Sequence, residues 1–163
     1  MQSKRNNQGF SLIELLIVIS VIVIIAAIGV PSLLSARRAA NEGSAQSSLR
    51  TIHSAQATYQ QTSGLGNFGS LNELLNARLI DPALGAGQKS GYIFVVTETD
   101  LVAGTSPARF KVTANPQVTS GASQSGTRKF GTREDGVMHG QTDALDTPLT
   151  DAELALLTNV MGN

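Results

Sequence analysis

The dominant pattern in the sequence is an apolar run from Leu12 to Val30, interrupted only by Glu14, Ser20 and Gly29. As a helix, this run would be about 28 Å long, close to the hydrocarbon thickness of a bilayer. An α-helix also pairs its own backbone N–H and C=O groups, as the bilayer core requires. The pattern therefore predicts a membrane-spanning helix near the start of the chain.

Glu14 is the one ionisable side chain in that run. A carboxylate inside an apolar helix costs up to about 2.5–3.5 kcal/mol on insertion scales, so it needs water, a proton or a charged partner. Cleavage between Gly9 and Phe10 would create an α-amino group four residues away, on the same helix face. The amine of a neighbouring chain could pair in the same way and set the axial register of a polymer. A carboxylate near enough to the interface to reach water is the alternative.

The helical pattern continues beyond the run. Pro31 removes one backbone hydrogen bond and predicts a kink rather than an end. Between residues 32 and 61, apolar residues recur at the spacing of an amphipathic helix that packs against a soluble domain. These residues are Ala45, Leu49, Ile52, Ala55 and Tyr59. We therefore expect one long helix over residues 10–61, with residues 10–30 in the membrane.

The rest of the chain predicts short elements. Ser70 and Glu73 have the spacing of a capping box and begin an expected helix that reaches Leu79 and is closed by Asp81-Pro82. Strands are expected at residues 92–97, 108–114 and 128–132, with a fourth beginning at 137–138. An antiparallel sheet of three or four strands against the helix would bury both apolar faces, which predicts an α+β fold.

Three further segments carry weaker signals. Residues 85–91 and 119–126 are rich in Gly, Ser and Gln and predict flexible connections. A second capping box at residues 150–153 predicts a short terminal helix that covers a sheet edge. The chain has no cysteine, so a disulfide cannot hold this tail.

Candidate catalytic and ligand-binding residues are few. His53 and His139 have no cysteine or second histidine near them in the sequence, which disfavours a transition-metal site. Glu134-Asp135 could suggest calcium, but a lone acidic pair followed by glycine is typical of a turn. Residues 85–91 lack the glycines that a phosphate loop requires. We therefore expect no enzyme, metal site or cofactor.

The overall charge gives no indication of a nucleic-acid partner. The 163 residues include 12 basic and 12 acidic side chains, so the formal net charge is zero. About 100 residues remain after the long helix, enough for one small globular domain.

The residues Lys4-Arg5, Gly9, Phe10 and Glu14, followed by an apolar run that ends at Pro31, closely resemble the class III leader and N-terminal helix of type IV pilins and pseudopilins. The resemblance covers about residues 4–59. It implies that a prepilin peptidase cleaves after Gly9 and methylates Phe10, and that Glu14 pairs with the amine of a neighbouring subunit. Pro31 would match the helix-bending proline of the family. Many pilins staple their C-terminal loop with a disulfide, which this chain cannot form.

The resemblance also implies an organisation and a set of partners. Residues 1–9 would be a leader, 10–61 the membrane and filament-core helix, and 62–163 a globular α+β domain. The subunit would be a single-pass inner-membrane protein before assembly and part of a cell-surface filament afterwards. Its expected partners are the prepilin peptidase, the inner-membrane assembly platform, membrane lipid and further copies of itself.

Other interpretations of the same residues stay open. A pseudopilin of a type II secretion or DNA-uptake system would have the same N-terminus and a periplasmic location. The lack of an acidic calcium loop near the C-terminus favours a pilin over this alternative. An uncleaved anchor that carries a binding or enzymatic domain is a second alternative. A secretory signal peptide cleaved near Ala27-Ile28-Gly29 is disfavoured, because Glu14 interrupts a core that is also too long.

Overall fold

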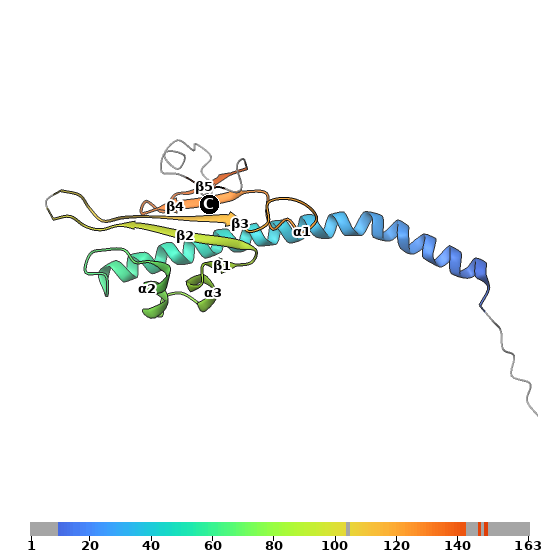
Figure 1. The fold of residues 1–163 in the computed structure, drawn as a ribbon, viewed down its shortest axis with the longest axis horizontal. Coiled ribbons are helices and arrows are strands. Elements are labelled where there is room, and N and C mark those ends of the chain that lie inside the picture. Colours follow the sequence, from blue (N-terminus) through green and yellow to red (C-terminus); the bar gives the residue numbers. More distant parts are fainter. Residues whose placement is uncertain (1–9, 104, 143–146, 148, 150–163) are drawn as a thin grey trace, which may run out of the picture. The chain divides into compact units, whose positions relative to one another are not determined.

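The computed structural model of the chain describes residues 10–103, 105–142, 147 and 149 (Figure 1). It divides the chain into two compact units, residues 1–36 and 37–163. The border falls inside helix α1 (Leu12–Gln61). The first unit holds the apolar part of α1. The second unit, called the head unit below, holds the remainder of α1, two short helices and a sheet.

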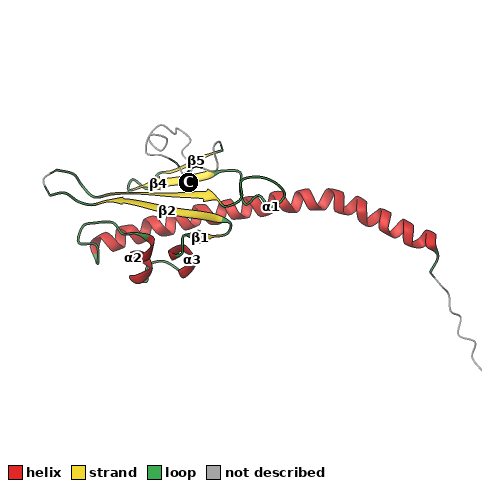
Figure 2. Ribbon diagram, in the orientation of Figure 1, coloured by secondary structure: helices red, strands yellow, loops and turns green. Residues whose placement is uncertain are grey.

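The head unit contains a five-stranded antiparallel sheet in which each strand pairs with its neighbour in the sequence (Figure 2). Its strands are β1 (Gln88–Lys89), β2 (Tyr92–Thr99), β3 (Arg109–Pro116), β4 (Lys129–Arg133) and β5 (Met138–Gln141). The predicted α+β class, with a long N-terminal helix and a small antiparallel sheet, is confirmed. The four predicted strands correspond to β2 through β5.

One face of the sheet and one face of α1 form the hydrophobic core. Leu49 and Ile52 of α1 are 0% exposed and belong to one buried cluster with Phe94, Phe110 and Phe130 of the strands. Each such side chain contributes about 1.5–3 kcal/mol when fully buried. The apolar stripe predicted for the second half of α1 is therefore confirmed as the face that meets the sheet.

The segment after α1 differs from the prediction of a single helix. Helix α2 (Leu71–Asn76) begins with the expected capping box but ends earlier than expected. Arg78 has a positive φ of 59°, which does not continue a helix. Asp81 then begins a second helix, α3 (Pro82–Gly85), by accepting from the amides of the next turn. Asp81-Pro82 is thus a helix start, because proline suits the first position of a helix.

Residues 85–91 are not the flexible connection that their composition predicts. Strand β1 lies within them and pairs with β2, so the sheet has five strands rather than three or four. Ser90 and Gly91 both have positive φ, 50° and 72°, as a tight two-residue hairpin turn requires. Strand β1 has two residues, too few to show an alternating pattern in the sequence.

Residues 119–126, also predicted to be a flexible connection, are bonded to α1. The Asn41 side chain donates to the backbone oxygen of Ser125 over 2.9 Å, and Glu42 accepts from the backbone amide of Thr127 over 2.7 Å. The Ser125 amide also donates to Val118 O over 2.9 Å, which closes the loop on itself. The polar residues in the middle of α1 therefore position this loop.

Gln56 is a buried polar residue whose role the sequence does not reveal. It is 0% exposed, and its side-chain amide exchanges two hydrogen bonds with the backbone of Gly69. The side chain thus pairs with the loop as a neighbouring strand would. This pairing satisfies both backbone groups of Gly69 in the core.

Two described residues show how part of the tail is held without a disulfide. Lys129 of β4 is 0% exposed, and its ammonium donates to the backbone oxygen of Thr147 over 3.3 Å. Leu149 is 1% exposed. A buried cation is tolerated only with such partners, so this contact ties the chain after β5 to the sheet. The predicted terminal helix at residues 150–160 lies outside the described residues.

The Gln56 pairing predicts a stability effect. Gln56→Leu keeps the volume but leaves two buried backbone groups of Gly69 without partners, so we expect a loss of about 2–4 kcal/mol in the free energy of unfolding. Urea unfolding of the full chain in detergent, followed by tyrosine fluorescence, measures this, because the chain has two Tyr and no Trp.

The matched control is Gln60→Leu, four residues further along α1. Gln60 donates one hydrogen bond to Gly66 O over 3.1 Å in a partly buried setting. We expect this variant to lose less than half as much stability. Equal losses in the two variants would contradict the importance assigned to Gln56.

Candidate functional site

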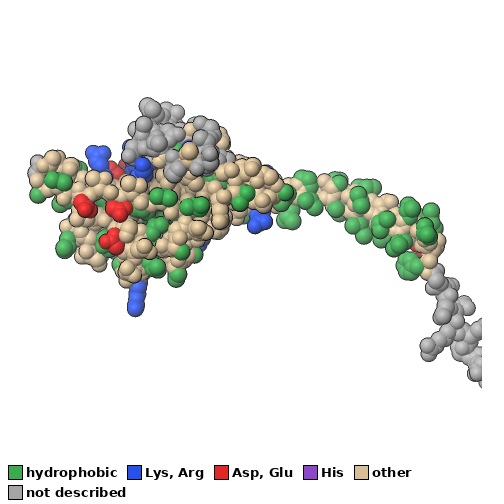
Figure 3. Space-filling model, viewed as in Figure 1, with side chains coloured by type: hydrophobic (Ala, Val, Ile, Leu, Met, Phe, Trp, Pro, Cys, Tyr) green, Lys and Arg blue, Asp and Glu red, His purple; other side chains and the backbone are tan. Residues whose placement is uncertain are grey.

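Within its own unit, the N-terminal part of α1 buries none of its large apolar side chains (Figure 3). Between residues 12 and 30, the exposed fraction of the large apolar side chains runs from 49% at Val21 to 81% at Leu12. Helix α1 is long and apolar enough to cross a membrane. A continuous apolar surface of this extent marks a site for lipid or for other protein.

Glu14 lies in the first turn of α1, where the helix itself provides a partner. The backbone amide of Ser11 donates to Glu14 Oε2 over 3.0 Å. The amides at a helix start have no partner within the helix, and the helix dipole favours negative charge there. The carboxylate therefore accepts one hydrogen bond within its own chain and has a second oxygen that can accept from another donor.

The sequence contains a signal for this contact that the apolar pattern alone does not reveal. Ser11 and Glu14 have the spacing of a capping box, as Ser70 and Glu73 do at the start of α2. Beside them, Phe10 is 84% exposed. Gly9 lies outside the described residues.

The other interruptions of the apolar run are accommodated within the helix. The Ser20 hydroxyl donates to Leu16 O over 2.7 Å, so it presents no unpaired donor to an apolar environment. A Cβ built on Gly29 would meet nothing within 4 Å. Pro31 lies inside α1, and the helix continues through it. The kink at Pro31 stays a prediction.

Two of the residues considered for metal or catalytic chemistry, His53 and Asp135, have structural contacts. His53 Nε2 lies 3.4 Å from Glu134 O, and its ring packs against Phe110 with the ring centroids 5.7 Å apart. Asp135 accepts from the Val137 amide over 2.9 Å and so stabilises the turn between β4 and β5. Among the described residues, no group of three or more His, Asp or Glu side chains could hold a metal ion.

Lys89, in the segment 85–91 that lacks the glycines of a phosphate loop, also has a structural partner. Lys89 forms an ion pair with Asp81 at 2.8 Å, from β1 to the start of α3. The hydrogen bond from Lys89 lowers the pKa of the Asp81 carboxyl. Both side chains are more than a third exposed, so the pair contributes little to stability.

Comparison with known proteins assigns the N-terminal segment. Residues 4–30 match the prokaryotic N-terminal methylation motif. The chain is 48% identical over 56 residues to the type IV wide pilus major component PilA4 of Thermus thermophilus. The match covers 34% of this chain and 43% of that protein, so the chain spans less than half of the relative. No solved structure matches the chain significantly.

These matches confirm the resemblance that the first residues predicted. The N-terminal part of the chain is similar to a type IV pilin and carries the N-terminal methylation motif. The motif includes Gly9, Phe10 and Glu14 and ends one residue before Pro31.

The loss of one hydrogen bond at Pro31 predicts a local weakness in α1. Pro31→Ala restores an N–H that can donate to Ala27 O, and the proline costs about 3 kcal/mol in a helix interior. We expect slower amide exchange over residues 28–32 in the variant, measured by hydrogen–deuterium exchange of the full chain in detergent. Ser32→Ala, which restores no bond, should leave exchange unchanged. Equal exchange in Pro31→Ala and the unaltered chain would contradict the predicted weakness.

Proposed function

We propose that the protein is a structural subunit of a type IV pilus-like filament. In this proposal, a prepilin peptidase cleaves after Gly9, Phe10 becomes the N-methylated first residue, and the mature chains polymerise. The observation that carries the proposal is the methylation motif at residues 4–30, placed directly on an apolar helix with exposed side chains. The similarity to a major pilus component favours a pilin over a pseudopilin.

The exposed helix explains how one chain can belong to a membrane and later to a filament. Its apolar side chains gain little from lipid over other apolar side chains, so neighbouring helices can replace the lipid at small cost. The backbone needs no change, because α1 already pairs its N–H and C=O groups internally. Membrane lipid, the inner-membrane assembly platform and other copies of the chain are the partners proposed for this surface.

Glu14 would supply the recognition between chains. Cleavage after Gly9 would leave a positive α-amine on Phe10, one residue from the Ser11 amide that Glu14 already binds. A carboxylate has room for about four hydrogen bonds, so the amine of a neighbouring chain need not displace Ser11. In surroundings without water, such a charge pair is far stronger than in solvent. The pairing would therefore select one axial position for each added subunit.

The proposal divides the chain by task. Residues 1–9 are the leader that is removed, residues 10–61 form the helix of the membrane and filament core, and residues 62–163 form the globular domain. Pro31 would let the apolar half of the helix bend relative to the half that carries the sheet. Before assembly the subunit is an inner-membrane protein, and afterwards it is part of an extracellular filament.

The proposed cleavage after Gly9 predicts that Gly9→Val blocks removal of residues 1–9. The peptidase site would accept glycine because it has no side chain, so we expect the variant to keep residues 1–9. Mass spectrometry of the N-terminal peptide, from sheared extracellular material and from membranes, measures this. The control is Gly29→Val, the same change at a position where a Cβ meets nothing within 4 Å. That variant should be processed normally.

The same measurement on the unaltered chain tests the function. An N-methylated Phe10 in the sheared fraction supports a surface filament. The same peptide confined to membranes would favour a pseudopilin. A peptide that still begins at Met1 would favour an uncleaved membrane anchor. Removal of residues 1–9 from Gly9→Val would contradict the assigned cleavage position.

If Glu14 pairs with the amine of a neighbouring chain, filament assembly should need its negative charge and not only its hydrogen bond to the Ser11 amide. Glu14→Gln keeps an oxygen that can accept from the Ser11 amide but removes the negative charge. We expect both Glu14→Gln and Glu14→Ala to be cleaved and to reduce the filament yield at least about tenfold, as loss of a desolvated charge pair does. The yield is measured as protein in the sheared fraction relative to the membrane fraction.

Ser20→Ala is the matched control for Glu14. It removes a polar group from the same helix without changing its charge, and the Ser20 hydroxyl bonds only within the helix among its described contacts. This variant should assemble normally. A normal filament yield from Glu14→Gln would show that charge pairing is not required.

A further inference from the structure

A groove of about 430 Å³ lies between the exposed side of α1 and the chain that follows α2. Ala55 and Leu79 supply apolar lining, and Arg50 is the one charged residue that lines it. The remaining lining consists of hydroxyl side chains of α1: Ser47, Thr51, Ser54 and Thr58. These residues together are called the α1 groove below.

The Arg50 side chain of the α1 groove is available to another molecule. It is exposed, and it forms no ion pair within the part of the chain that the structure describes. None of the side chains three or four positions away along α1 is acidic, so the helix itself provides no carboxylate beside it. Arg78, next to Leu79 in the sequence, is exposed as well. The groove therefore presents uncompensated positive charge.

The end of β2 and the residues after it combine negative charge with exposed apolar side chains. Glu98 and Asp100 are exposed carboxylates, and Leu101 and Val102 are 50% and 53% exposed. The hairpin of β2 and β3 here extends past the strands that flank it (Figure 1). The Leu101 amide donates to Asn67 Oδ1 over 2.8 Å, which fixes this segment against the loop after α1. Residues 98–102, called the β2 tip below, are thus a projecting apolar surface with a charged border, as protein contact sites are.

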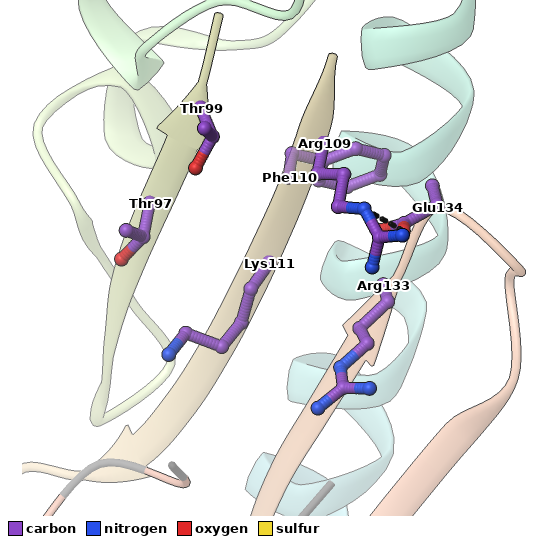
Figure 4. Close-up of a pocket in the computed structure, with 7 residues that line it drawn as sticks. All are labelled: Thr97, Thr99, Arg109, Phe110, Lys111, Arg133 and Glu134. Carbon is purple, nitrogen blue, oxygen red and sulfur yellow. Dashed lines mark ion pairs between the residues drawn. The ribbon is translucent and has the colours of Figure 1, made fainter. Parts of the chain in front are cut away.

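The carboxylates of the β2 tip have no cation beside them. They line a pocket of about 360 Å³ together with Glu73, and no Lys or Arg belongs to its lining. The cations in the pocket lined by β2, β3 and β4 are already engaged (Figure 4). Arg109 pairs with Glu134 at 4.0 Å, and Lys111 and Arg133 also have interactions within the chain. A partner for the β2 tip therefore has to bring its own positive charge.

We propose that the β2 tip of one chain binds in the α1 groove of a neighbouring copy, with Asp100 against Arg50. Leu101 would then lie against Leu79. The inference rests on the proposed filament, which brings copies together. Asp100 lines its pocket with Tyr59, and Arg50 lies nine residues earlier, about 14 Å along the helix, so the two do not meet within one chain. A contact between two different surfaces is heterologous, and its repetition gives an open helical array rather than a closed dimer.

The lining of the α1 groove favours a second copy over nucleic acid as its occupant. Proteins that hold a polyanion neutralise several phosphates with Lys and Arg, whereas Arg50 is the one charged residue in this lining. Its apolar residues match the apolar side chains that the β2 tip exposes beside its carboxylates. A carboxylate that meets an arginine selects its partner by position as well as by charge.

Thiol crosslinking in filaments tests the contact directly, because the chain has no cysteine of its own. The variant carries Ser54→Cys in the α1 groove and Val102→Cys in the β2 tip, and it keeps every charged side chain of both surfaces. A short bis-maleimide crosslinker joins thiols that lie near each other without requiring disulfide geometry. We expect sheared filaments treated with it to give a ladder of crosslinked chains that extends beyond the dimer.

Two controls define the background. Ser54→Cys alone should give dimers at most. Ser54→Cys combined with Gln117→Cys places the second thiol at an exposed position outside the β2 tip and should give no ladder. Filaments that contain the Ser54→Cys, Val102→Cys chain but show no ladder would overturn the inference and leave the proposed function standing. An unaltered chain that gives no filament would overturn both.

Charge reversal gives a second test that does not depend on crosslinking. Arg50→Asp and Asp100→Arg should each lower the sheared filament yield about tenfold, because like charges would then face each other. The double variant restores opposite charges and should recover the yield to within about twofold. Gln117→Glu, which adds a negative charge outside both surfaces, should leave the yield unchanged. A normal yield from Arg50→Asp, or no recovery in the double variant, would overturn the inference.

Discussion

The structure depends on one constraint: an apolar helix with exposed side chains must be covered by lipid or by protein. The backbone of the run from Leu12 to Val30 needs no partner outside the helix, because a helix pairs its own N–H and C=O groups. Its side chains, about half exposed or more, still need a neighbour. Lipid and other apolar helices are nearly equivalent neighbours in dispersion energy, so either can cover this surface.

Polar side chains in the apolar part of this helix form hydrogen bonds with nearby backbone groups. The Ser20 hydroxyl bonds to the preceding turn, and the Glu14 carboxylate accepts from the amide of Ser11 at the helix start. The head unit follows the same rule at Gln56, whose side chain pairs with a loop backbone, and at Lys129, which donates to Thr147. In each case a buried or lipid-facing polar atom has a backbone partner nearby.

The sheet gives the head unit two chemically different faces. Alternation in β2 and β3 sends aromatic and aliphatic side chains towards α1 and threonines and cations away from it. Acidic residues gather where the α1 side of the sheet meets the loop after α1 and the start of α2. Side-chain alternation along the strands thus gives the two faces of the sheet different chemistry.

The sequence by itself determined the elements whose signals are long and periodic. The apolar run, the stripe from Ala45 to Ala55 and the alternation in β2 and β3 each repeat over enough residues to fix the helix, its buried face and the antiparallel sheet. The methylation motif was equally readable, because its chemistry depends on adjacent residues. Tertiary structure alone decided β1, the start of α3 at Asp81 and the pairing of Gln56 with Gly69. These features join residues that are distant in the chain or too few to form a pattern, so their energies exist only once the fold has brought the partners together.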